Sequence, residues 1–211
     1  MPNGLISIHS SIILFGIAGL FGKFLSFDAV LIVLGRTFIA FAALVFVHRL
    51  MQVPLLFKKR EHWIWMVLTG FILAVHWIGF FRSIQLSSVA IGLLSFSSYP
   101  LFTTFLEPIF FQEQLKRKNI MAVAAVMAGL ALIATSASSD SSQLTQEEVF
   151  QGLSWGVFAS FSFAVLTLLN RKHVQDHHPL TVACWQNGIA AFVLFPVSLG
   201  YEWQFSSQEI G

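Results

Sequence analysis

Seven apolar segments, each long enough to cross a lipid bilayer, follow one another along the 211 residues of this chain. A bilayer offers no water to unpaired backbone groups, so such segments cross it as helices of about 20 residues. Charged residues make up only 10% of the chain, against about a quarter in soluble domains. The sequence therefore predicts an all-α integral membrane protein with seven transmembrane helices. These segments are residues 5–25, 29–48, 63–84, 87–112, 119–137, 150–170 and 179–200.

The basic residues are concentrated in every second loop. Nine of the twelve Lys and Arg residues lie in the loops after the second, fourth and sixth segments, namely Arg49, Lys58, Lys59, Arg60, Lys116, Arg117, Lys118, Arg171 and Lys172. The positive-inside rule predicts a cytoplasmic N-terminus for this multi-pass protein, which we expect in the plasma membrane. The base-free connection from Ser136 to Val149 and the C-terminus are expected outside. Because the net charge is only +2, nucleic acid is not an expected partner.

Residues that lie 150 positions apart match weakly but in order. The run Arg36-Thr-Phe-Ile-Ala-Phe aligns with Gln186-Asn-Gly-Ile-Ala-Ala. The break at Asp28-Ala29 aligns with His178-Pro179. Because each copy would hold five spans, an odd number, the second copy would enter the membrane in the opposite orientation. We therefore expect one complete five-helix repeat in residues 1–138 and the first two helices of an inverted second repeat in residues 150–211.

The fourth segment carries a line of polar residues along one helical face. The line consists of Ser88, Ser95, Tyr99, Thr103 and Glu107, of which the last four recur every four residues. In a bilayer such a line must face protein or a water-filled cavity, and Pro100 in mid-helix also suits a cavity wall. These residues are thus predicted to line a substrate pathway. Alternatively, the hydroxyls bond to preceding carbonyls or a neighbouring helix, and Glu107 is structural.

Of four basic side chains expected in the outer half of the membrane, Lys23 and Arg82 lie near its boundary, whereas Arg36 and His76 lie deeper. Arg36 and His76 are each on the order of 10 Å below the outer boundary in this topology. Arg36 is expected to face a cavity and to meet a carboxylate or phosphate of the substrate. Its alternative is an ion pair with Asp28, and the alternative for His76 is a hydrogen bond to a neighbouring helix. Trp77, beside His76, is included in the predicted pathway.

A polar cluster occupies the predicted cytoplasmic loop after the sixth segment. His173 and His177 have the i, i+4 spacing of a helical metal site, but Pro179 and the charged neighbours favour a solvated turn. The chain has no glycine-rich phosphate loop, no Ser/His/Asp order and no HExxH pattern. We therefore predict no metal site, no cofactor and no enzyme activity.

The residues around the third and fourth segments resemble a known family. The run His76-Trp-Ile-Gly-Phe-Phe-Arg-Ser-Ile-Gln-Leu-Ser-Ser-Val-Ala-Ile-Gly is followed by Tyr99-Pro-Leu-Phe and by Glu113 before a basic turn. This order is similar to that of the EamA branch of the drug/metabolite transporter superfamily. The resemblance implies ten spans in two inverted five-span repeats, a central substrate cavity and transport of small metabolites without ATP hydrolysis. This chain has three spans fewer than that pattern.

The sixth segment carries a stripe of small residues at which another helix can approach closely. The stripe consists of Gly152, Gly156, Ser160 and Ala164. With three spans fewer than the family pattern, we expect this stripe to lack its covering and the chain to form a homodimer.

Two functions remain. A secondary transporter of a small-molecule substrate, anionic or zwitterionic, accounts for the repeat, the polar line and the buried ionisable groups together. A nontransporting membrane subunit, or an inactive fragment of such a transporter, accounts better for the smaller number of spans.

Overall fold

The structure is a computed structural model that describes residue 9 and residues 25–57, 59–112, 114–115, 117–140 and 144–201, apart from the side chains at 126 and 130–140. In these ranges every regular element is a helix. The helices are α2 (Ala29–Met51), α3 (Arg60–Leu86), α4 (Val89–Phe96), α5 (Tyr99–Phe111), α6 (Arg117–Asp140), α7 (Gln146–His173) and α8 (Pro179–Ser198). The second, third, fifth, sixth and seventh predicted segments are thereby confirmed as helices. The first, with Lys23, falls almost entirely outside the described residues.

Five helical stretches in the described ranges are long and apolar enough to cross a membrane. They are α2, α3, the α4–α5 stretch taken together, α7 and α8. This agrees with an all-α membrane protein. The count of seven spans and the internal repeat stay predictions.

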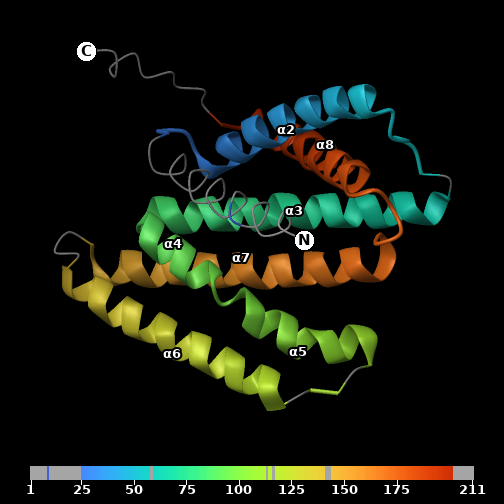
Figure 1. Ribbon diagram of the computed structural model, residues 1–211. Helices are drawn as coiled ribbons and strands as arrows, with labels where there is room; N and C mark the ends of the chain where they lie inside the picture. The colour runs from blue at the N-terminus through green and yellow to red at the C-terminus, as the bar shows by residue number, and fades with distance from the viewer. Residues whose placement is uncertain are drawn as a thin grey trace.

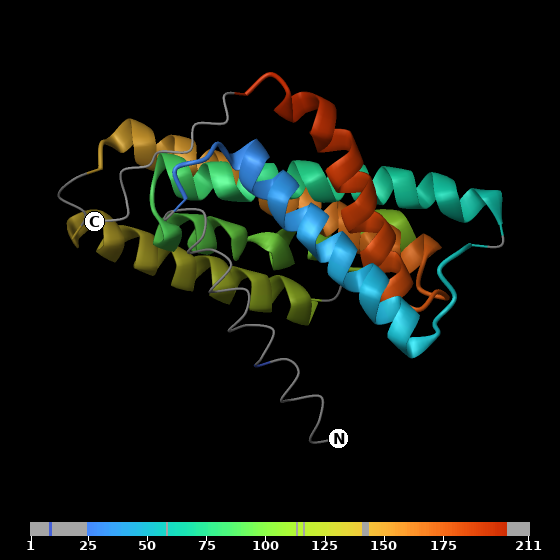
Figure 2. The ribbon, with the colours of Figure 1, turned by 90° about the horizontal axis from the view of Figure 1, so that it is seen from above.

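The helices α3 and α7 lie side by side and antiparallel through the middle of the molecule (Figure 1). On one side α8 packs against both α2 and α3, and on the other α4 and α5 pack against α7, with α6 against α4 and α5 (Figures 1 and 2). One apolar core joins α2, α3, α4, α7 and α8. The two predicted repeats therefore share this core.

The helix ends that carry the basic residues gather toward one end of the bundle. The ends of α2, α5 and α7 and the starts of α3, α6 and α8 lie toward the right in Figure 1. The charge pattern in the sequence and the arrangement of the helices therefore agree with each other. Which side of the membrane this end faces stays a prediction.

The fourth span is broken, which corrects the prediction of one continuous helix with Pro100 in its middle. α4 ends at Phe96, Ser97 and Ser98 form a turn, and Pro100 lies in the first turn of α5. Because proline has no N–H, it cannot donate to the carbonyl of Phe96 four residues earlier. The hydroxyl of Ser160 on α7 donates to the carbonyl oxygens of Phe96 (2.8 Å) and Ser95 (3.0 Å) instead. A neighbouring helix thus satisfies the break.

The small-residue stripe of α7 is covered within the chain. A Cβ atom at Gly152 or Gly156 would collide with the side chain of Ser87 or Ser95, respectively. The hydroxyl of Ser83 on α3 donates to the carbonyl of Gly152 (2.6 Å). The expectation of an uncovered stripe is therefore wrong, because α3 and α4 already occupy it. This surface is therefore not available for the predicted self-association of the chain.

The helices α2 and α8 begin 150 residues apart, as the alignment of Asp28-Ala29 with His178-Pro179 predicted. The carboxylate of Asp28 accepts the N–H of Val30 (2.9 Å), and the ring of His178 accepts the N–H of Leu180 (3.3 Å). Each helix therefore starts with a side-chain N-cap, which satisfies a backbone N–H that the helix itself leaves unpaired.

Candidate functional site

Arg36 and Trp77 form the centre of the candidate site. The guanidinium carbon of Arg36 lies 3.3 Å from the centroid of the Trp77 ring, a cation–π contact between α2 and α3. Trp77 is buried, and Nη1 of Arg36 is a buried atom with no hydrogen-bond partner in the described part of the chain. Asp28, the predicted alternative partner of Arg36, pairs with Arg82 instead (3.1 Å). Arg36 therefore has an N–H group for which the described residues supply no hydrogen-bond acceptor.

His76 lies beside this pair and is fully buried. Its Nδ1 is 2.9 Å from the carbonyl oxygen of Ala159 on α7, so the hydrogen bond to a neighbouring helix, left open by the sequence, is present. The other ring nitrogen, Nε2, is buried and has no partner among the described residues. The ring centroids of His76 and Trp77 are 4.9 Å apart. Arg36, His76 and Trp77 thus form one group.

The close approach of α3 and α7 positions His76. Gly79 lies three residues after His76, and a Cβ atom there would be only 3.3 Å from the Cβ atom of Ala159. Because Gly79 has no side chain, α7 comes near enough for its Ala159 carbonyl to reach the imidazole. The position of His76 therefore depends on the absence of a side chain one turn away.

The polar line of the broken span has mostly local partners. Ser95 and Thr103 donate to carbonyls of their own helices, at Ile91 (2.7 Å) and Pro100 (3.0 Å), which is the alternative left open for them. Ser88 caps α4. The Tyr99 ring packs on Phe163, whose ring also contacts His76. Tyr99 is therefore connected to His76 through the ring of Phe163.

Glu107 is separated from that group. It forms an ion pair with Arg171 near the end of α7, and the guanidinium also lies 4.4 Å over the ring of Phe111. The two charged side chains are 29% and 48% exposed. Glu107 therefore has a structural partner, as the second interpretation of this residue required.

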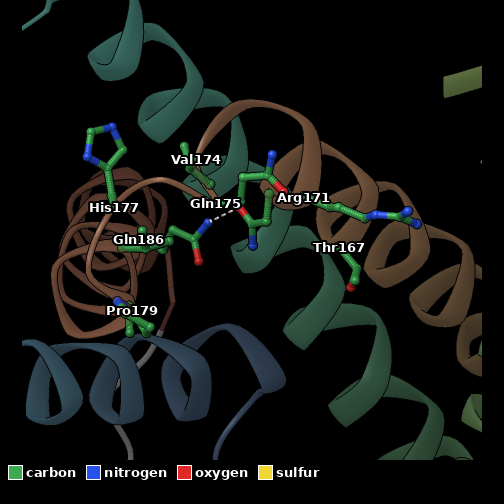
Figure 3. Close-up of a pocket in the computed structure, with 10 residues that line it drawn as sticks. Thr167, Arg171, Val174, Gln175, His177, Pro179 and Gln186 are labelled. Atoms are coloured by element: carbon green, nitrogen blue, oxygen red, sulfur yellow. Dashed lines mark hydrogen bonds between the residues drawn. The ribbon is translucent and has the colours of Figure 1, made fainter. Parts of the chain in front are cut away.

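A cavity of about 530 Å³ opens between the last turns of α7 and the first half of α8. At its centre the Gln186 amide donates to the side-chain oxygen of Asn170 (2.7 Å), while Arg171 extends away from this pair (Figure 3). Neither Asn170 nor Gln186 was among the predicted site residues. The alignment of Gln186 with Arg36 was the one available signal.

The histidines around the connection between α7 and α8 have separate partners. α7 ends at His173, which stacks on Trp65 with 3.5 Å between ring centroids. His177 follows that helix end, and its Nε2 is 2.9 Å from Nδ1 of His62. Burial, and the charge of His62, lower the pKa of His177, and Asp176 partly opposes this. In the described ranges no three His, Cys, Asp or Glu residues form a metal-binding group.

A bundle of long apolar helices with ionisable groups buried between them is typical of an integral membrane protein whose interior handles a polar solute. The model of the EamA-like transporter family matches residues 2–135, and the chain belongs to this family of membrane proteins. It is also similar to the uncharacterized transporter YxxF of Bacillus subtilis (strain 168), with 30% identity over 127 residues. That match covers 60% of this chain and 40% of the relative. No solved structure matches the chain.

Proposed function

We propose that the protein is a secondary transporter that moves a small anionic or zwitterionic metabolite across the plasma membrane, with Arg36 as its anion-binding group. The observation that carries this proposal is that Nη1 of Arg36 is buried and has no hydrogen-bond partner among the described residues. A bilayer does not tolerate such a donor on a lipid face, and a guanidinium binds carboxylate or phosphate through two parallel N–H groups. The family and the relative's name support transport in general.

In the proposed site, Trp77 orients the guanidinium of Arg36. Its indole ring covers one face of the Arg36 guanidinium, so that an anion approaches the plane of the N–H groups from the edge. The ring therefore holds the cation in one orientation before the substrate arrives. His76 and Tyr99 complete the wall of the pathway. The proposed pathway continues past Ser95 and Thr103 on the fourth span, whose hydroxyls bond within that span, toward the Glu107–Arg171 pair.

The proposed topology places the N-terminus and the basic helix ends in the cytoplasm. In this orientation the Arg36 group lies in the outer half of the membrane and the Glu107–Arg171 pair near its inner boundary. The alignment of α2 with α8 supports an inverted repeat, in which Gln186 corresponds to Arg36 near the opposite face.

Anion binding can be tested by the thermal unfolding of the full chain in lipid nanodiscs. Acetate, methanesulfonate and, as a cationic control, choline are added to the wild-type protein, to Arg36→Gln and to the matched variant Arg82→Gln. A ligand that binds the native state stabilises it by about 2.7 kcal/mol at about 100 times its Kd. We expect stabilisation by the anions in the wild type and in Arg82→Gln, and none in Arg36→Gln. Equal stabilisation of all three proteins would contradict the proposal.

A nontransporting membrane subunit, or an inactive fragment of a transporter, is the second candidate, because the match with the Bacillus protein spans only 40% of that relative. Proteoliposomes separate the two. A transporter exchanges radiolabelled acetate across the bilayer in a manner that depends on Arg36, whereas the second candidate binds the anion without exchanging it.

A further inference from the structure

The protonation of His76 follows from its one hydrogen bond. The carbonyl oxygen of Ala159 can only accept, so Nδ1 of His76 must carry the hydrogen. In the neutral ring Nε2 is then a bare lone pair, and this atom is buried without a partner among the described residues. A buried acceptor without a donor costs free energy, so its presence calls for an explanation. A proton is the smallest ligand that such an atom can take up.

The surroundings of His76 hold a single charge in the described part of the chain. That charge is Arg36 on α2, and no carboxylate acts on the imidazole. The groups that face the ring from its own helix, from α4 and from α7 are the uncharged rings of Trp77, Phe80, Phe96 and Phe163. The Asp28–Arg82 ion pair lies six residues further along α3.

We propose that Nε2 of His76 is the proton-binding position of this protein and that it binds a proton together with the anion at Arg36. The inference rests on the proposed function. The proton comes from water on the side to which the site is open, and it adds to the lone pair of Nε2 without breaking any covalent bond. A monoanion and a proton then cross together, so the step moves no net charge.

The electrostatics of the group explain why the two ligands bind together. A proton on Nε2 places a second positive charge beside Arg36 in a region of low dielectric, and an anion on the guanidinium removes this repulsion. By linkage, the proton raises the anion affinity by the same factor by which the anion raises the proton affinity. The guanidinium and the imidazole both flank Trp77, at 3.3 and 4.9 Å from its ring. These distances allow a separation of at most roughly 8 Å between the guanidinium carbon and the imidazole centroid, and Coulomb's law there, with an effective dielectric of about 20, gives a coupling of about 30-fold.

Calorimetric titration of the full chain in nanodiscs with methanesulfonate tests this inference. The charge of this anion does not change with pH, so any pH dependence belongs to the protein. Titration in two buffers of different ionisation enthalpy gives the number of protons taken up with each anion. We expect proton uptake on binding, and an anion affinity that rises toward the limit of about 30-fold set by this coupling as the pH falls from about 8 to about 4.

Two variants assign the proton to its atom. His76→Asn keeps an amide N–H where Nδ1–H meets Ala159 but removes the titratable Nε2, so proton uptake should disappear. His48→Asn is the matched control, because His48 is also buried and its Nε2 has no partner in the described part of the chain, yet it lies twelve residues from Arg36 along α2. Proton uptake should persist in that variant. If His76→Asn does not fold, the ¹⁵N signals of the wild-type histidines decide whether an imidazole Nε2 gains a proton when the anion binds.

The possible failures are distinguishable. Binding that depends on Arg36 but takes up no proton would overturn the role of His76 and leave the anion site standing. Proton uptake that persists in His76→Asn and vanishes in His48→Asn would also overturn it. If no binding of methanesulfonate depends on Arg36, the proposed function fails together with this inference.

Discussion

At the scale of single residues, the hydroxyl of Ser160 replaces a hydrogen bond that Pro100 cannot donate. Pro100 leaves the carbonyl of Phe96 without its helical donor, and Ser160 donates to that carbonyl from α7. We expect Ser160→Ala to lower the free energy of unfolding by about 1–2 kcal/mol, because the partly buried carbonyl of Phe96 loses this donor. Unfolding of the nanodisc or micelle-bound protein by added SDS measures this change.

Ser162→Ala is the matched control for this prediction. Ser162 is also a buried serine of α7, but its hydroxyl donates to Phe158 within the same helix, whose ladder remains when it is removed. Its cost should be under about 0.5 kcal/mol. Equal effects of the two substitutions would show that the Ser160 hydrogen bond does not support the break.

The sequence was sufficient to select Arg36 and His76, because an ionisable residue within a long apolar run is conspicuous without any structure. It did not identify their partners. Trp77 faces Arg36 and Ala159 faces His76 only because helices that are distant in sequence pack together. The hydrogen bond between Asn170 and Gln186 was missed for a similar reason, since an isolated amide in a span gives a weak signal.

At the scale of helices, the contact between α7 and its neighbours depends on glycine. A Cβ atom at Gly156 would collide with the hydroxyl of Ser95 and would also press on Ser83. We expect Gly156→Ala to destabilise the protein by about 1–3 kcal/mol, because α4 must shift or Ser95 must leave its rotamer. Gly35→Ala is the control, since no atom of the described residues lies within 4 Å of a Cβ there. If both glycine variants unfold alike, close packing at Gly156 is not needed.

Apolar length predicted most helices well because it measures the one property that a bilayer enforces. The segments at 29–48 and 179–200 became α2 and α8 with nearly the predicted starts. The sequence predicted that Pro100 removes a hydrogen bond in mid-helix, but not that the helix ends at Phe96, because a four-residue spacing of polar groups continues across Pro100. That break depends on the Ser160 hydroxyl of α7, and the spacing of residues within the fourth span gives no information about another helix.

The contact between the start of α3 and the α7–α8 loop should respond to pH. The pKa of His177 is lowered, so between that value and about 6.5 the folded protein binds fewer protons than the unfolded chain. Stability should therefore fall as the pH drops through this range. The change should stay under about 1 kcal/mol, because the ring is partly exposed and water screens its charge.

Thermal unfolding between about pH 8 and pH 5 measures this effect. His177→Gln keeps an amide near the position of Nε2 but does not titrate, so its stability should depend less on pH than that of the wild type. His178→Asn keeps an N-cap acceptor for α8 and should retain the wild-type dependence. An unchanged pH dependence in His177→Gln would assign the titration to another group.

At the scale of the whole molecule, the two ends of the bundle differ in charge, and this difference predicts the orientation in the membrane. The basic residues near the ends of α2 and α7 lie toward one end, and the acidic first turn of α7 lies at the other (Figure 1). Because translocation of Lys and Arg is disfavoured, the basic end should face the cytoplasm.

Single cysteines at the two ends test this orientation. Cys184 is buried in α8 and is first replaced by alanine, after which Glu147→Cys and Gln175→Cys are made at exposed positions. A membrane-impermeant maleimide should label the cysteine at position 147 in intact cells and the one at 175 only after permeabilisation. Labelling at 175 in intact cells, with protection at 147, would reverse the topology. It would also place the Arg36 group in the inner half of the membrane, so that anion and proton would enter the site from the cytoplasm by the shorter route.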